Sequence, residues 1–197
     1  MGRTISVVVP VYNEERRIQP TLERLSGYLN DNFKEFEIIV VDDGSSDGTV
    51  TLVKRLEKRL GDIRLIQYPA NKGKGYAIKQ GALFSRGALF LTCDADLSTP
   101  IEELDKLIPF IISGFDIAIG SRGLDESDIA VRQPWYREGM GRIFNLFVRS
   151  IVIGGIKDTQ CGFKLFNGDI ARDLFKKSRL NGFSFDAEIL FLAKKAG

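Results

Sequence analysis

Two carboxylates separated by one residue, Asp94 and Asp96, lie in the segment 93–98, which follows directly on the apolar run 88–92. That run has the length and composition of a buried strand, and open α/β sheets bind their ligands beyond the carboxyl ends of the strands. Two acids at this spacing repel each other, and a divalent cation bound through oxygen and shared with a phosphorylated ligand relieves the repulsion. The pair therefore predicts a site for a metal ion and a diphosphate.

The other residue types narrow the choice of metal. The chain has no histidine and only two cysteines, Cys93 and Cys161, which disfavours zinc or a soft-ligand metal and favours Mg²⁺ or Mn²⁺. Two distant cysteines also make no disulfide framework. We expect reduced thiols that pack in the interior and do not act as nucleophiles.

Three more polar segments follow predicted strands. Segment 10–15 ends the first strand, although its Asn13 could instead cap the next helix. The second strand ends in Asp42 and Asp43, where a carboxylate can accept the ring N–H of uracil or guanine, or where a turn simply caps a helix. Segment 72–75 offers lysine and glycine to a phosphate, or forms an exposed basic turn. All three would meet the acid pair at one sheet edge, which favours a shared ligand site.

The elements that must position these segments alternate strictly between strand and helix up to residue 120. Such alternation predicts an α/β fold with a mainly parallel sheet and helices on both faces. The apolar runs predict strands at 5–11, 36–41, 63–67, 88–92 and 116–120. The helical spacing and the start and stop residues predict helices at 18–33, 49–60, 75–85 and 100–113.

The pattern changes after residue 120. Segment 121–133 is polar and loop-like, and a long helix is expected at 135–153. That helix mixes apolar and basic residues, so it could pack on the domain or rest on a membrane surface. A loop into a strand is expected at 158–167, and two short helices are expected at 169–177 and 186–195. The abrupt finish after the last helix favours a longer natural protein.

Composition limits the class of protein. The 197 residues with 44% apolar content fit one domain with a proper core, and 28 basic against 26 acidic residues argue against nucleic acid as a partner. The first residues lack the apolar core and cleavage site of a signal peptide, which predicts a cytoplasmic protein. The sequence contains no run of about 18 apolar residues, so it predicts no membrane-spanning helix. Peripheral attachment to a membrane stays open.

The chain resembles the large inverting family of nucleotide-sugar glycosyltransferases with the GT-A (nucleotide-diphospho-sugar transferase) fold. The resemblance lies in segments 10–14, 42–45 and 94–96 and extends over nearly the whole chain. It implies that Asp94 and Asp96 hold a metal that bridges the donor diphosphate. It also implies a single domain 1–197 with a nucleotide-sugar-binding part at 1–120 and an acceptor-binding part at 121–197. The residues expected at the nucleotide sugar and its metal are Pro10, Tyr12, Glu14, Asp42, Asp43, Lys74, Asp94, Ala95 and Asp96.

The acceptor-binding part at 121–197 narrows the choice of acceptor substrate. Within that family, the second part resembles the polyprenyl-phosphate sugar transferases in segments 120–122, 158–164 and 185–188 and in the series Arg137, Gly141 and Asn145. Segments 158–164 and 185–188 are most similar to the dolichyl-phosphate glucosyltransferase branch. The resemblance implies UDP-glucose as donor, a polyprenyl or dolichyl phosphate as acceptor, and action at the cytosolic face of a membrane. Gly141 stands where relatives often carry serine. The expected catalytic residues are Asp96, Arg122, Arg137, Asp158 and Asp186.

The chemistry of a phosphate acceptor agrees with this residue inventory. A sugar hydroxyl usually needs a general base as it attacks, whereas a lipid phosphate is already anionic, and the chain has no histidine to act as that base. Arg122, Arg132 and Arg137 could position the anionic acceptor, or could simply be surface charges. Asp186 and Glu188 could likewise face the acceptor or cap a helix.

Three alternatives stay open at this stage. The same chemistry could use GDP-mannose or another nucleotide sugar. A sugar-1-phosphate nucleotidyltransferase would use a related sheet and a metal, but its glycine-rich basic loop after the first strand is replaced here by segment 10–15. A non-catalytic module that binds a nucleotide sugar or a lipid head group is the third.

Overall fold

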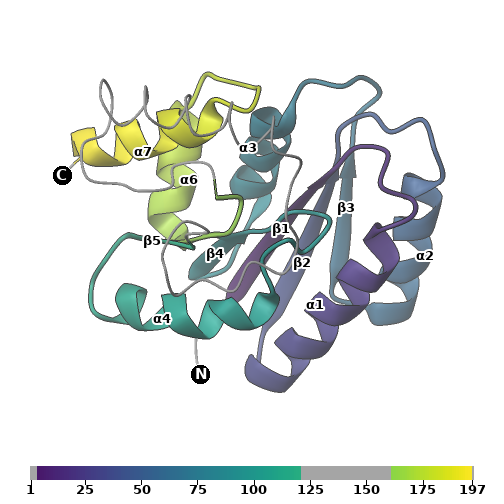
Figure 1. Cartoon of the computed structure of the whole chain (residues 1–197), viewed down its shortest axis with the longest axis horizontal. Helices are drawn as coiled ribbons and strands as arrows, with labels where there is room; N and C mark the ends of the chain where they lie inside the picture. Colours follow the sequence, from purple (N-terminus) through teal and green to yellow (C-terminus); the bar gives the residue numbers. More distant parts are fainter. Residues whose placement is uncertain (1–3, 121–160, 197) are drawn as a thin grey trace, which may run out of the picture.

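The computed structural model describes residues 4–120 and 161–196, which form a six-stranded sheet between two layers of helices (Figure 1). The strand order is β3-β2-β1-β4-β6-β5. The strands are β1 (Ile5–Val11), β2 (Phe36–Asp42), β3 (Ile63–Gln67), β4 (Leu89–Thr92), β5 (Ile117–Ile119) and β6 (Lys164–Asn167). The helices are α1 (Ile18–Asn32), α2 (Thr49–Leu60), α3 (Lys74–Phe84), the 3₁₀ turn η1 (Ile101–Glu103), α4 (Leu104–Ile112), α6 (Gly168–Lys177) and α7 (Phe185–Ala196).

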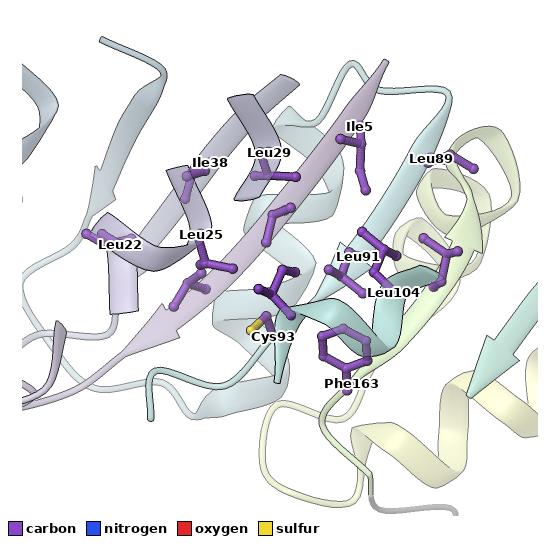
Figure 2. Packing of buried hydrophobic residues seen from close by; sticks show 14 of the residues in the cluster. Ile5, Leu22, Leu25, Leu29, Ile38, Leu89, Leu91, Cys93, Leu104 and Phe163 are labelled. Atoms are coloured by element: carbon purple, nitrogen blue, oxygen red, sulfur yellow. The ribbon is translucent and has the colours of Figure 1, made fainter. Parts of the chain in front are cut away.

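The two layers follow from alternation along the strands. Val7 and Val9 of β1 pack with α1, α2 and α4, whereas Val8 of the same strand packs with α3, α6 and α7. Figure 2 shows the first of these cores, in which side chains of α1 and α4 lie against β1 and β4. Because both faces are covered, the strands read as continuous apolar runs, and the predicted mainly parallel α/β fold is confirmed.

One strand departs from the parallel pattern. β6 lies between β4 and β5 and is antiparallel to both. The sequence predicted a strand near its position but carried no signal for its direction or its neighbours, since these depend on pairing between distant segments. The consequence concerns the site: β6 begins at the sheet edge where β4 ends, which places segment 161–164 beside the loop that carries the acid pair.

None of the described helices is long and apolar enough to cross a membrane. The helix expected at 135–153 and the polar segment 121–133 lie outside the described residues.

Candidate functional site

The loops after β1, β2, β3 and β4 meet at the carboxyl edge of the parallel strands, as predicted. The first two loops are joined through Asn13, whose backbone N–H donates to Ser45 Oγ at 2.9 Å and whose Oδ1 accepts from the Ser46 N–H at 2.9 Å. Asn13 holds a left-handed φ of 56°, a conformation that asparagine tolerates better than most residues. It therefore ties two loops together and does not cap α1, whose N-cap residue is Arg17.

The first loop also borders a hollow of about 330 Å³, lined by residues 13–17 and by Asp47. Tyr12 precedes this hollow with about half of its surface exposed, and Pro10 is partly buried at the end of β1. A larger hollow, of about 700 Å³, is lined by residues 30–36 and Asp62 at the opposite edge of the sheet, away from the acid pair. None of the site residues predicted from the sequence lines this larger hollow, so the carboxyl edge remains the candidate site.

Asp42 and Asp43 are both buried at the end of β2. The two carboxylate oxygens of Asp43 accept the backbone N–H groups of Lys72 and Gly73 at 2.7 and 2.9 Å. Asp42 accepts the Ser45 N–H at 3.2 Å with one oxygen, and its other oxygen finds no hydrogen-bond partner among the described residues. Asp43 thus holds the third loop in place, and contact of either acid with a nucleotide base stays a prediction.

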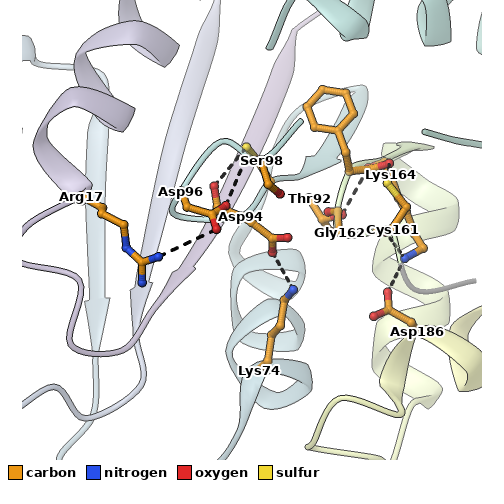
Figure 3. A network of polar contacts seen from close by, with 12 residues as sticks. Arg17, Lys74, Thr92, Asp94, Asp96, Ser98, Cys161, Gly162, Lys164 and Asp186 are labelled. Carbon is orange, nitrogen blue, oxygen red and sulfur yellow. Dashed lines mark hydrogen bonds and ion pairs between the residues drawn. The ribbon is translucent and has the colours of Figure 1, made fainter. Parts of the chain in front are cut away.

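The acid pair occupies the turn after β4, and each of its members faces a cation (Figure 3). Asp94 Oδ1 accepts from Lys74 Nζ at 2.6 Å, and both side chains are largely buried. Asp96 is more open, with 42% of its side chain exposed, and its Oδ2 lies 4.0 Å from Arg17 Nη1. Its Oδ1 accepts the Ser98 N–H at 3.0 Å. Ala95 is buried between the two acids, and its carbonyl accepts the hydroxyl of Thr21.

Lys74 lies in a strongly negative environment. Burial by itself would lower the pKa of its ammonium, but the nearby carboxylates of Asp94, Asp186 and Asp96 outweigh burial and raise the pKa. Lys74 therefore stays charged at neutral pH and is the main counter-ion of Asp94. Glu14, in turn, is paired with Arg17 at 2.7 Å, which links the first loop to the acid pair.

Asp186, an expected catalytic residue, lies in the first turn of α7 and is 6% exposed. It forms an ion pair with Lys164, which is itself 2% exposed and also donates to the Cys161 carbonyl. Burial raises the pKa of Asp186, although Lys164 and Lys74 act in the opposite direction. Glu188 accepts the backbone N–H groups of Arg179 and Leu180, at 2.9 and 2.8 Å. It therefore holds the loop before α7, and any contact of Asp186 with an acceptor stays a prediction.

The structure also reveals residues that sequence reasoning missed. A Cβ atom on Gly162 would lie 2.2 Å from Asp94 Oδ2, so this carboxylate rests directly on the glycine. Arg17 was not expected at the site, since only the folded chain brings it to Asp96. Gly162 and Lys164 lay within the 158–164 motif, but the sequence did not indicate their contacts with Asp94 and Asp186. Arg122, Arg132, Arg137 and Asp158 lie outside the described residues.

The close contact at Gly162 leads to a first prediction. Gly162→Ala should displace the Asp94 carboxylate and lower any activity that depends on this carboxylate about a hundredfold, because small displacements of reacting groups have effects of that size. Initial rates at saturating substrate would measure it. Gly27→Ala is the control, because a Cβ there meets nothing within 4 Å. Equal activity of the two variants would show that the position of Asp94 is not critical.

The donor set fits a hard divalent cation. Within residues 4–120 and 161–196 no group of three or more acidic or cysteine side chains surrounds a metal position. Asp94 and Asp96 supply carboxylate oxygens, the ligand type of Mg²⁺ and Mn²⁺. A cation at such a pair needs further oxygen ligands, and a diphosphate and water can provide them.

Comparison with solved structures defines the class of fold. Glucosyl-3-phosphoglycerate synthase from Mycobacterium tuberculosis, in complex with Mn²⁺, UDP-glucose and phosphoglyceric acid, matches with a TM-score of 0.68 at 22% identity, over 96% of this chain and 64% of that one. The mannosyltransferase PcManGT from Pyrobaculum calidifontis, in complex with GDP-Man and Mn²⁺, matches with a TM-score of 0.60 at 20% identity, over 88% and 47%. The fold is thus the GT-A glycosyltransferase fold, as predicted.

The sequence comparison defines the family. Residues 6–175 match the family described as Glycosyl transferase family 2, and the chain belongs to that family. It is similar to proteins named dolichyl-phosphate beta-glucosyltransferase: 40% identical to that of Dictyostelium discoideum over 97% of this chain, and 34% identical to that of Homo sapiens over 98%. The chain covers 62% and 63% of these two relatives, so it spans about three fifths of their length.

Proposed function

We propose that this chain carries the donor site of an inverting glucosyltransferase that transfers glucose from UDP-glucose to a dolichyl or polyprenyl phosphate. The geometric observation behind the proposal is the pair Asp94 and Asp96, set among the loops at the ligand edge of the sheet and faced by Lys74 and Arg17. Alternating acids and cations suit a ligand that combines a diphosphate with a divalent metal. The names of the relatives support the sugar and the acceptor.

Donor binding would use the residues already gathered at the sheet edge. Asp94 and Asp96 would hold Mg²⁺ or Mn²⁺, and the metal, when bound, would offset negative charge on the diphosphate. Tyr12, Glu14 and the buried acids at the end of β2 would surround the base and ribose. Lys74, at the first residue of α3, would face the diphosphate, since cations and helix N-termini both favour phosphate.

The transfer step needs no general base. An oxygen of the acceptor phosphate would attack the anomeric carbon of glucose while the bond between that carbon and the β-phosphate oxygen breaks. UDP would leave with the electron pair of that bond, and the anomeric configuration would invert. Arg122 and Arg137 would hold the acceptor phosphate in line for this attack, because guanidinium groups bind phosphate through two donors. The reaction would take place at the cytosolic face of a membrane, where a lipid phosphate presents its head group.

A donor competition experiment tests the proposal. The protein is incubated with dolichyl phosphate, Mn²⁺ and radiolabelled UDP-glucose, GDP-mannose or UDP-galactose, and lipid-linked label is extracted and counted. We expect lipid-linked label from UDP-glucose. This label should be lost when EDTA removes the metal and should return when Mn²⁺ is added back. Label from GDP-mannose alone would refute the glucosyl assignment. Donor binding without transfer to any lipid would favour a binding module.

A further inference from the structure

Lys74 pairs directly with the Asp94 carboxylate. Its ammonium lies 2.6 Å from Oδ1, while Oδ2 and the carboxyl carbon rest against Gly162 (Figure 3). The carboxylate, with 27% of its side chain exposed, thus lies between a cation on one side and the backbone of the 161–164 segment on the other. A metal ion that is to bind Asp94 must first take the place of the ammonium, because two cations cannot share that position without strong repulsion.

The backbone of Lys74 is fixed, so only its side chain can give way. Gly73 has a φ of 100°, and a Cβ there would lie 2.4 Å from the Asn181 carbonyl oxygen. On the other side, a Cβ on Gly75 would lie 2.6 Å from Phe185 Cβ. The turn therefore packs directly on the loop before α7. The four-carbon stem of the lysine, by contrast, is flexible and can carry the charge to a new partner.

Lys74 also stands where a cation is unfavourable without a nearby anion. It is the first residue of α3, whose first turn contains no acid, and the partial positive charge of a helix N-terminus repels an ammonium. The carboxylate of Asp94 pairs with it there at 2.6 Å. A diphosphate at the same helix end would offer the ammonium a second anionic partner and would be attracted by the helix terminus too.

We infer that Lys74 acts as an internal counter-ion that keeps a divalent cation from binding the acid pair until a nucleotide diphosphate draws the ammonium away from Asp94. The metal and the nucleotide then bind together, and each strengthens the affinity of the other. The inference rests on the proposed function in one respect, namely that the physiological anion is a nucleotide diphosphate. Lys74 is accordingly a residue that sets the order of binding, in addition to any contact with the donor.

Mn²⁺ titration tests this role without any transfer reaction. Free Mn²⁺ is followed by electron paramagnetic resonance for the wild type, Lys74→Met and Lys74→Gln, each with and without UDP. We expect Mn²⁺ alone to bind both variants about tenfold more tightly than the wild type, because no ammonium has to leave Asp94. We also expect the factor by which UDP strengthens Mn²⁺ binding to shrink in both variants by a similar amount, since coupling between two ligands is reciprocal.

Lys72→Met provides a matched control. It removes the same charge from the same loop, but Lys72 Nζ lies over the Tyr76 ring at 4.6 Å from its centroid and has no contact with Asp94. Its Mn²⁺ affinity should stay within about twofold of the wild type. Thermal unfolding shows whether each variant is folded. Because two different substitutions are made at position 74, the test still stands if one of them fails to fold.

An Mn²⁺ affinity that is unchanged or weaker in both Lys74 variants would overturn the inference. Equal tightening in Lys72→Met would overturn it too, because the effect would then be one of net charge. The Mn²⁺ arm needs no nucleotide, so it decides the role of Lys74 even where UDP fails to bind. Failure of UDP to bind the wild type would count instead against the proposed donor.

Discussion

Asp96→Asn should reduce glucosyl transfer about a thousandfold, which corresponds to about 4 kcal/mol of transition-state stabilisation. The substitution keeps the shape of the side chain, and an amide oxygen can still accept the Ser98 N–H that Asp96 Oδ1 accepts now. What disappears is the negative charge of the more exposed member of the acid pair. Initial rates with UDP-glucose, dolichyl phosphate and saturating Mn²⁺ measure the effect.

Asp116→Asn is the matched control for that experiment. Asp116 is exposed, and it precedes β5, at the sheet edge opposite the acid pair. The same change of charge there should leave the rate within about twofold, because exposed charges at that distance are screened by solvent and salt. Retention of full activity by Asp96→Asn would contradict the proposed role of the acid pair in holding a metal.

The second large effect concerns stability. Lys164→Met should lower the free energy of unfolding by about 3–5 kcal/mol, because it leaves the buried carboxylate of Asp186 without its cation. Burial raises the pKa of Asp186 and Lys164 opposes that rise, so removal of Lys164 takes away the cation that favours the charged carboxylate. Urea unfolding followed by circular dichroism at neutral pH measures the change.

Two further variants separate a buried charge from a lost contact. Lys164→Met combined with Asp186→Leu should recover most of the stability, since an apolar pair can replace a buried ion pair at little cost. Lys177→Met removes an exposed partner of Asp173 and should cost less than about 1 kcal/mol. If the double variant were as unstable as Lys164→Met alone, the loss would come from packing and not from the uncompensated charge.

The order of elements could be predicted from the sequence because its causes are local. The strand predicted at 5–11 coincides with β1, and the helix predicted at 49–60 coincides with α2. The spacing of apolar residues reflects which face of each strand or helix is buried, and this spacing can be seen within each short segment of the sequence. The carboxyl-edge position of Asp94 and Asp96 followed from the same pattern, since both acids come directly after a strand.

Only the tertiary structure decided which side chains meet at that edge. The antiparallel insertion of β6 beside β4 brings Gly162 under Asp94 and sets Lys164 against Asp186, and neither contact follows from local sequence. Lys74 was expected at the site, but its direct pairing with Asp94 from the start of α3 was seen only in the folded chain. Such contacts depend on strand order and register between distant segments, which no local propensity encodes. The sequence by itself determined the α/β alternation and the acids at the ends of strands, and the folded sheet determined the cations and the glycine that surround them.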